Sequence, residues 1–185
     1  MQATQVKLVP LMWKHFDDLF TYAQDKTLWQ WWIRPPLVTQ EAMQAEIQKA
    51  LDDKAKGLRQ PFAIQYLPTQ KFIGSTSLYP DLYHKTAEIG STWLATEFHK
   101  SGVNRECKYL LISHVFNELK LNRASFQTDV FNSRSRKAIE GLGAIYEGTL
   151  RHDKIVWNGR IRSSVIYSIL REEWPNTNLY KQFTQ

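Results

Sequence analysis

The stretch that decides the fold is EFHKSGVNRECKYLLISHVFNEL, residues 97–119. It begins as a polar loop with one glycine, Gly102, and continues as a helix whose apolar residues recur at helical spacing. A strand pattern ends just upstream, at Trp93 and Leu94. A strand, a polar loop and a helix N-terminus together favour a phosphate-bearing ligand, because the first helical N–H groups lack partners and the helix dipole is positive there. One glycine alone is weak evidence, since any strand-to-helix turn can use one.

The rest of the chain alternates extended and helical patterns. Before this stretch, the sequence predicts strands at 6–11, 62–67, 71–79 and 86–94, and helices at 16–23 and 39–56. After it come a strand at 123–130, a helix at 135–142 and two strands around the turn at 158–159, whose Asn-Gly pair is typical of a type I′ hairpin. Residues 172–180 have no assigned structure. This order predicts an α/β or α+β fold with a mixed sheet, in which the crossover helix makes its flanking strands parallel.

Composition limits the class of protein. A length of 185 residues fits one domain, 1–185, and 43% hydrophobic with 23% charged residues indicates a soluble globular protein. One cysteine, no long apolar run and no signal-peptide core predict a cytoplasmic protein without membrane association. The formal charge of +6 favours anionic partners, which include nucleic acid, membrane headgroups and a phosphorylated cofactor. The oligomeric state stays open, a homodimer included.

A second group of motifs lies downstream, in TDVFNSRS at 128–135 and RKAIEGLGAIYEGTLR at 136–151. With the loop, these motifs resemble the Gcn5-related N-acetyltransferases, in the branch similar to the ribosomal-protein N-terminal acetyltransferases. The matching segments are the pyrophosphate loop His99–Asn104, the Asn-x-x-Ser motif Asn132–Ser135, the step Leu142–Ala144 and the Glu-Gly-x-Leu-Arg motif Glu147–Arg151. The resemblance covers nearly the whole chain. It implies a mostly antiparallel mixed sheet with helices on both faces, whose two middle strands splay apart around the acyl-CoA arm.

The resemblance implies acetyl-CoA as co-substrate and an amine as acceptor. Backbone N–H groups of the loop would cradle the pyrophosphate, strand backbone would pair with the pantetheine, and an asparagine side chain would bond the CoA arm. The cofactor-binding residues are then Trp93, Leu94, His99, Lys100, Ser101, Gly102, Val103, Asn104, Arg105 and Asn132. The chain departs from the family pattern at His99, where Arg or Gln is usual, and at Asn104, where Gly or Ala is usual. The alternative role for Asn132 is a plain helix N-cap.

Acetyl transfer needs a base, because a primary amine is mostly protonated at neutral pH. Glu88 is the candidate, since it lies in a strand that should border the cleft; His84, in a loop, is the alternative. For the acid, Ile139 stands where many relatives have a tyrosine, so the resemblance implies Ser135. A serine bonded back to its own helix is the competing interpretation. Cys107 lies on an apolar helix face, which favours core packing, and the histidine spacing predicts no metal site.

Three tryptophans, Trp29, Trp31 and Trp32, lie in the LWQWWIRPP connection at 28–36. They are candidates for the acceptor-binding wall, and a buried aromatic cluster is the alternative; we expect at least one in each role. The function predicted is transfer of an acetyl group to a protein N-terminus or a small amine. Two other functions stay open: a CoA-binding sensor without chemistry, and a basic nucleic-acid-binding module, which lacks an RNA-binding signature. The sequence does not identify the acceptor.

Overall fold

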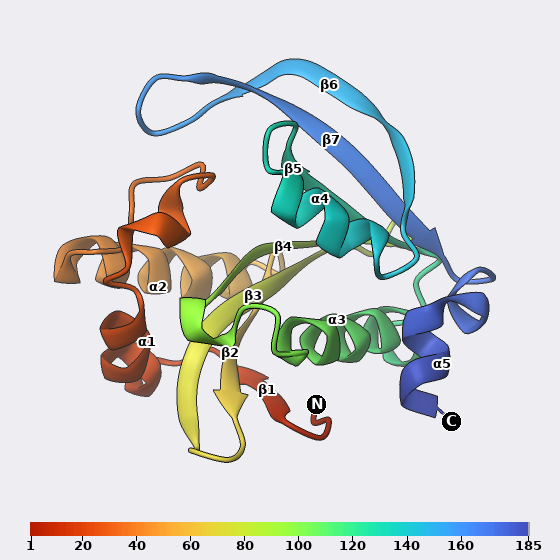
Figure 1. The fold of residues 1–185 in the computed structure, drawn as a ribbon, viewed down its shortest axis with the longest axis horizontal. Helices are drawn as coiled ribbons and strands as arrows, with labels where there is room; N and C mark the ends of the chain where they lie inside the picture. Colours follow the sequence, from red (N-terminus) through yellow and green to blue (C-terminus); the bar gives the residue numbers. More distant parts are fainter. Residues whose placement is uncertain (185) are drawn as a thin grey trace.

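A seven-stranded sheet in the order β1-β2-β3-β4-β5-β7-β6 organises residues 1–184, the part of the chain that the computed structural model describes (Figure 1). The strands are β1 (Val6–Pro10), β2 (Gln60–Tyr66), β3 (Lys71–Asp81), β4 (Thr86–Leu94), β5 (Arg123–Asp129), β6 (Ile145–Ile155) and β7 (Ile161–Leu170). The helices are α1 (Phe16–Tyr22), α2 (Gln40–Ala55), α3 (Val103–Ser113), which a π-helical turn (His114–Glu118) extends, α4 (Ser133–Glu140) and α5 (Asn178–Thr184). Every neighbouring pair is antiparallel except β4 and β5. The mixed sheet and its parallel crossover are therefore confirmed.

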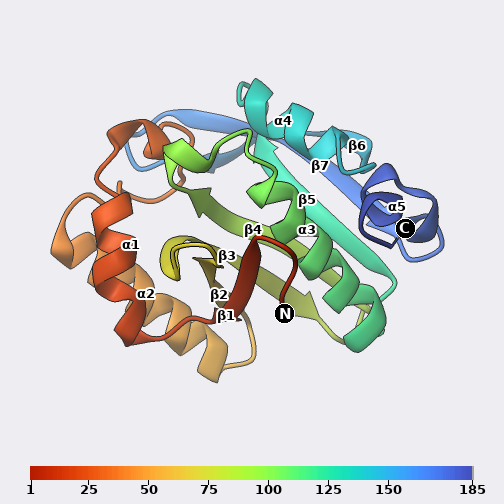
Figure 2. The same cartoon turned by 60° about the horizontal axis from the view of Figure 1, so that its bottom comes forward.

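Two apolar cores cover the two faces of the sheet. On one face, α1 and α2 bury Leu19, Met43 and Ile47 against Trp93 of β4. On the other face, α3 lies across the strands, as Figure 2 shows, and buries residues such as Leu111. The helical spacing of the apolar residues in α3 gives it one buried stripe, which is why the helix lies flat against the sheet. Across residues 1–184, no helix has both the length and the apolar character needed to cross a membrane.

Local signals explain where most helices begin and end. The Thr39 side chain accepts a hydrogen bond from the Ala42 backbone N–H and caps α2. Gly57, with φ at +72°, follows the end of that helix. The hairpin at β6 and β7 is confirmed, but the predicted type I′ turn at Asn158 and Gly159 is wrong. That turn needs positive φ at both residues, and of the two only Gly159 has it; the i→i+3 bond runs instead from the Gly159 N–H to the Val156 carbonyl. The fourth helix begins at Ser133, two residues earlier than predicted.

The C-terminal tail, unassigned from sequence, forms α5 and packs on α3. Its Phe183 ring stacks on Tyr109 with centroids 4.7 Å apart, and Trp174 lies 6.0 Å from the same tyrosine. Gln182 accepts hydrogen bonds from the guanidinium of Arg105, at the start of α3. The aromatic residues of the tail therefore complete the core on this face, and the tail supports the helix that follows the glycine loop.

Candidate active site

The two middle strands of the sheet separate after three residue pairs. β4 and β5 pair at Thr86–Arg123, Ala87–Ala124 and Glu88–Ser125, and no further. Beyond these pairs, β4 runs on to Leu94 and β5 to Asp129. The facing backbone edges of both strands are thus unpaired with each other over the rest of their length. An extended ligand can add hydrogen bonds to such an edge, as a further strand would.

A β-bulge lies in β4 just where the strands part. The register of β3 against β4 shifts between Ser75 and Ser77, and Ser91 has φ at +46°, a left-handed conformation for a non-glycine residue. The Ser91 hydroxyl lies 2.6 Å from the Tyr79 hydroxyl and accepts a hydrogen bond of 3.3 Å from Arg34. These side-chain contacts hold an otherwise strained residue in place.

The loop between β4 and α3 presents unpaired backbone donors. Gly102 has φ at +90° and is the N-cap of α3, and the first intrahelical bond runs from the Glu106 N–H to the Gly102 carbonyl. The N–H groups of Asn104 and Arg105 precede that bond and so have no partner inside the helix. Because Gly102 carries no side chain, a ligand can approach these donors closely. The geometry fits an anionic group such as a pyrophosphate.

His99 connects this loop to the helix on the other side of the gap. Its Nε2 lies 2.9 Å from the Leu94 carbonyl oxygen, and its Nδ1 lies 3.1 Å from the Arg134 guanidinium. A neutral ring with the proton on Nε2 satisfies both contacts, since Nδ1 then accepts from the arginine. Burial and the nearby Arg134 charge lower the pKa of His99, which favours that neutral form. The histidine therefore fixes the last residue of β4 against α4.

Glu88 lies in the last residue pair before the strands separate. Burial raises the pKa of its carboxyl group, and the positive charges of Lys154 and Arg162 oppose that rise. Among residues 1–184, no hydrogen bond engages this carboxylate, and its Oε1 lies beside Gly90. A half-buried carboxylate with a raised pKa and a free oxygen can accept a proton from an amine.

The start of α4 places two polar side chains beside the glycine loop. Asn132 Oδ1 accepts a hydrogen bond of 3.0 Å from the Ser135 N–H, so the asparagine is the N-cap of α4. Its amide NH₂ group makes no bond within residues 1–184 and is available to a ligand. The Ser135 hydroxyl likewise has no partner in the described part of the chain, so the back-bonded arrangement is not the one observed.

The three tryptophans of residues 28–36 differ in burial, and Trp32 packs beside Trp29 against the same core. Trp29 is 1% exposed, donates its ring N–H to the Ala23 carbonyl and packs 5.4 Å from Trp93. Trp31 and Trp32 are half-buried, and the Arg160 guanidinium lies 5.6 Å from the Trp31 ring. The tip of the β6–β7 hairpin joins this loop, since the Trp157 N–H donates to the Ile33 carbonyl at 2.9 Å.

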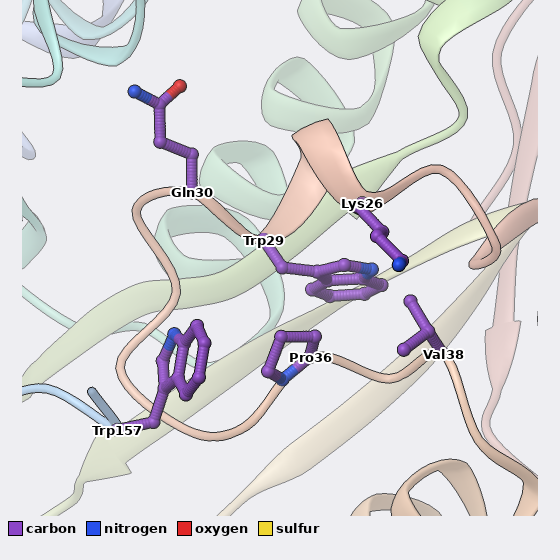
Figure 3. Close-up of a pocket in the computed structure, with 6 residues that line it drawn as sticks. All are labelled: Lys26, Trp29, Gln30, Pro36, Val38 and Trp157. Atoms are coloured by element: carbon purple, nitrogen blue, oxygen red, sulfur yellow. The ribbon is translucent and has the colours of Figure 1, made fainter.

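A pocket of about 320 Å³ opens where the loop and the hairpin meet (Figure 3). The rings of Trp29, Pro36 and Trp157 make its apolar wall, and Val38, Lys26 and Gln30 complete the lining. Its surface is mostly apolar with one cationic and one amide group, which is the usual character of a small-ligand site. Two segments more than 100 residues apart in the sequence therefore enclose one space.

Comparison with known proteins agrees with this arrangement of a split sheet, a glycine loop and a helix N-terminus. Residues 5–145 match the acetyltransferase (GNAT) domain family. The chain belongs to the GNAT acetyltransferase family. Over 94 residues it is 38% identical to "Putative ribosomal N-acetyltransferase YdaF" of Bacillus subtilis (strain 168), a match that covers 51% of this chain and 50% of that protein. The chain thus spans about half the length of the curated relative it matches.

Solved GNAT structures have the same fold. A GCN5-related N-acetyltransferase from Brucella melitensis has a TM-score of 0.89 and 26% sequence identity, over 98% of this chain and 82% of that chain. Spermidine N-acetyltransferase from Vibrio cholerae, solved in complex with CoA and spermine, has a TM-score of 0.76 and 18% identity, over 93% of this chain and 99% of that chain. The predicted GNAT sheet with splayed middle strands is confirmed.

Three further residues considered from the sequence have these positions. The Arg105 side chain donates to the Gly141 carbonyl at 2.8 Å, which leaves the predicted role of its backbone N–H unaffected. His84, the alternative base, lies exposed in the β3–β4 turn and contacts Asp81 at 2.8 Å. Cys107 is buried, and burial raises the pKa of its thiol to about 12, which excludes a thiolate nucleophile. Within residues 1–184, no group of His, Cys, Asp or Glu side chains could hold a metal ion.

Other residues of this region were not predicted from the sequence. Lys154 and Arg162 come from the hairpin strands and influence Glu88 by their charge. Arg34 and Arg59 both contact the Glu46 carboxylate of α2, and this group holds the 28–36 loop near the bulge. The Asn-Gly turn predicted the hairpin itself, but a turn signal does not show which distant loop its tip will contact.

Proposed function

We propose that this protein is an N-acetyltransferase that moves the acetyl group of acetyl-CoA to a primary amine by direct attack. The observation that carries the proposal is the position of Glu88, a carboxylate without a hydrogen-bond partner among residues 1–184, where the sheet opens. The open edge of β4 and the Gly102 loop are arranged for an extended, anionic cofactor. Family membership supports acetyl-CoA as that cofactor.

Each residue of the site has one role in this proposal. Backbone N–H groups of the loop bind the pyrophosphate, chiefly those of Asn104 and Arg105, since the N–H groups of His99 and Ser101 are bonded within the chain. The Trp93–Leu94 backbone pairs with the pantetheine, and the Asn132 amide donates to the same arm. Glu88 accepts the proton of the attacking amine. The amine nitrogen forms the new C–N bond as the C–S bond breaks, and Ser135 donates a proton to the departing thiolate. Ser135 regains a proton from solvent as Glu88 releases the one it accepted, which restores both groups. The amide and the free thiol of CoA are the products.

The acceptor is an amine that enters between the tryptophan loop and the hairpin tip. The pocket walled by Trp29 and Trp157 would bind its apolar part, and half-buried Trp31 and Trp32 would contact it beside that pocket. One acceptor class is a protein N-terminus, for which the likeness to a putative ribosomal N-acetyltransferase supports a ribosomal source, and a small amine is the other. A cytoplasmic location fits the single buried cysteine. A homodimer stays a prediction that light scattering can test.

The experiment that tests the proposal is turnover of acetyl-CoA with a panel of amines, with released thiol as the readout. The panel should contain N-terminal peptides of ribosomal proteins, spermidine and simple alkylamines. We expect amine-dependent thiol release with at least one class. Binding without turnover across the panel would indicate a CoA sensor, and salt-sensitive RNA binding without CoA binding would indicate a nucleic-acid module.

Acetyl-CoA is expected to raise the melting temperature of the protein. A ligand that binds only the folded state stabilises it by RT ln(1 + [L]/Kd), which is about 2.7 kcal/mol at a hundredfold excess over Kd. Differential scanning fluorimetry with acetyl-CoA and with adenosine as the matched control measures the shift. An equal response to both ligands would contradict a site built for the pyrophosphate.

Ser135→Ala is expected to lower kcat less than loss of the base does. A thiol with a pKa near about 8.5 is already a good leaving group, so the proton donor supplies a smaller share of the rate. Steady-state kinetics of Ser135→Ala beside Ser133→Ala, a neighbouring exposed serine of α4, measures the effect. Equal rates for both variants would remove Ser135 from the chemistry.

A further inference from the structure

A buried lysine lies directly beneath the bulge of β4. Lys108 of α3 is 6% exposed, and its Nζ donates a hydrogen bond of 2.6 Å to the Thr92 hydroxyl. Within residues 1–184, no carboxylate forms an ion pair with it. Placing an uncompensated cation in an apolar core costs free energy, and natural cores avoid it. Such a residue therefore calls for a reason other than stability.

Thr92 connects Lys108 to the backbone of the bulge through further hydrogen bonds. Its hydroxyl lies 2.7 Å from the Thr76 hydroxyl on β3 and 3.4 Å from the Gly90 carbonyl oxygen. A hydroxyl has two acceptor sites and one proton. Lys108, a donor only, fills one acceptor site of Thr92. The Thr92 proton is then left for the Thr76 hydroxyl or the Gly90 carbonyl, so Thr92 links the lysine to β3 and to the backbone of the bulge.

The bulge is held from the opposite face as well. Ser91, the residue with positive φ, contacts Tyr79 and Arg34 on the α2 side of the sheet, while Thr92 contacts Lys108 on the α3 side. These two residues lie between Glu88 and the Trp93–Leu94 backbone. The conformation of the bulge therefore sets the distance and angle between the proposed base and the proposed cofactor strand.

We propose that Lys108 is a positioning residue for acetyl transfer, which acts through Thr92 to hold the β4 bulge so that Glu88 meets the thioester in a reactive geometry. This inference rests on the proposed function above. It explains why a costly buried cation is present, because misplacement of reacting groups by about 1 Å can lower a rate about 100-fold. Strain and buried charge at functional sites are commonly offset by stability elsewhere in the fold.

The main test is Lys108→Met, which keeps the length and apolar stem of the side chain and removes its charge and donors. We expect kcat to fall about 10- to 100-fold. The Kd for CoA should stay within about threefold, because the pyrophosphate loop and Asn132 are untouched. The melting temperature should stay equal or rise, since an unpaired buried cation is removed. A lower melting temperature with unchanged kcat would instead show that Lys108 is a purely structural residue.

Two further variants sharpen the test. Thr92→Val removes the hydroxyl with little change in shape, so Lys108→Met should lower kcat little further in a Thr92→Val background. Full additivity of the two losses would overturn the route through Thr92. Lys49→Met, at an exposed lysine of α2 that pairs with Asp53, is the matched control and should leave kcat unchanged.

The pH dependence of stability gives an independent test of whether Lys108 is a buried cation. Burial lowers the pKa of Lys108 to about 8, against about 10.4 in an unfolded chain. Between these values the unfolded state binds more protons, so this group makes stability rise with pH, and below about pH 8 it imposes its full cost. Thr76 and Thr92, which face it from β3 and β4, do not titrate there, and its helix neighbour Cys107 keeps its thiol proton. The melting-temperature gain of Lys108→Met should be largest below pH 8 and shrink toward pH 10.

Hydrogen exchange tests the effect of Lys108 on the bulge without relying on enzyme activity. In Lys108→Met, backbone amides at residues 90–93 should exchange at least about tenfold faster, while those in β2 should not change. Unchanged exchange rates at residues 90–93 would overturn the proposal that Lys108 holds the bulge, whatever the kinetics show. If the wild-type protein turns over no amine but the bulge amides of Lys108→Met exchange faster, the proposed function is wrong and the effect of Lys108 on the bulge remains. If the wild-type protein does turn over an amine and Lys108→Met has the same kcat, only the positioning role of Lys108 is wrong.

Discussion

Gly102→Asp is expected to abolish CoA binding while the protein stays folded. Gly102 is the N-cap of α3 with φ at +90°, a conformation that Asp and Asn tolerate better than other residues. The nearest atom to an added Cβ is the Gln5 Nε2, at 3.7 Å, so the side chain has room. Its carboxylate would stand where a pyrophosphate needs unpaired N–H donors. Like charges in contact cost several kcal/mol, so affinity should fall at least about 100-fold.

Gly102→Asn is the matched control, because it has the same shape and backbone preference without the charge. Its CoA affinity should fall less than about tenfold, through crowding alone. Calorimetric titration with CoA measures both affinities, and a thermal melt establishes that both variants are folded. Equal CoA binding by the Asp and Asn variants would show that no anionic group of the ligand lies at this helix terminus.

Glu88→Gln is expected to lower kcat by about two to four powers of ten without weakening CoA binding, because it keeps the shape of the side chain and removes its basicity. Since burial raises the pKa of Glu88, wild-type activity should fall as the pH drops through that raised value and the base becomes protonated. The variant should lack this acidic limb. Its rate should rise at high pH, as more of the amine becomes neutral.

The kinetic measurement is a pH profile of kcat and of kcat/KM for wild type, Glu88→Gln and Glu172→Gln. Glu172 is exposed after β7, and its loss of charge should leave both profiles unchanged. If the pH profile of Glu88→Gln overlays that of the wild type, Glu88 is not the base, and a water molecule accepts the amine proton instead. His84 is a poor substitute, since it lies exposed in the β3–β4 turn and contacts Asp81.

Local patterns predicted much of the fold. The spacing of apolar residues predicted α3, the Thr39 cap predicted the start of α2, and the Asn-Gly pair predicted the last hairpin. Gly102 was predicted as the backbone position that lets a ligand approach, and its positive φ fits that role. These features depend on a few adjacent residues, whose conformational preferences do not need the rest of the chain. The roles of Glu88 and Ser135 stay predictions.

Contacts between distant segments could not be predicted in this way. Trp29, Trp31 and Trp32 share one connection, but which of them is core depends on Trp93 and on Arg160, each more than 60 residues away. The bulge was not predicted because its residue with positive φ is Ser91, a residue type that rarely adopts this conformation, and not the adjacent Gly90. Arg105 was predicted as a backbone donor only; its side chain bonds to the C-terminal helix, whose docking depends on aromatic packing that spacing does not reveal.

The split in the sheet also has a mechanical consequence. One half-sheet is β1 to β4 and the other is β5 to β7, and within residues 1–184 only three residue pairs join them in the sheet. Glu88 belongs to the pair nearest the opening. The core under α3 contains residues of both halves, so side-chain packing supplies the connection that backbone pairing lacks there. An extended ligand bonded to both open edges would act as a cross-link between the two halves.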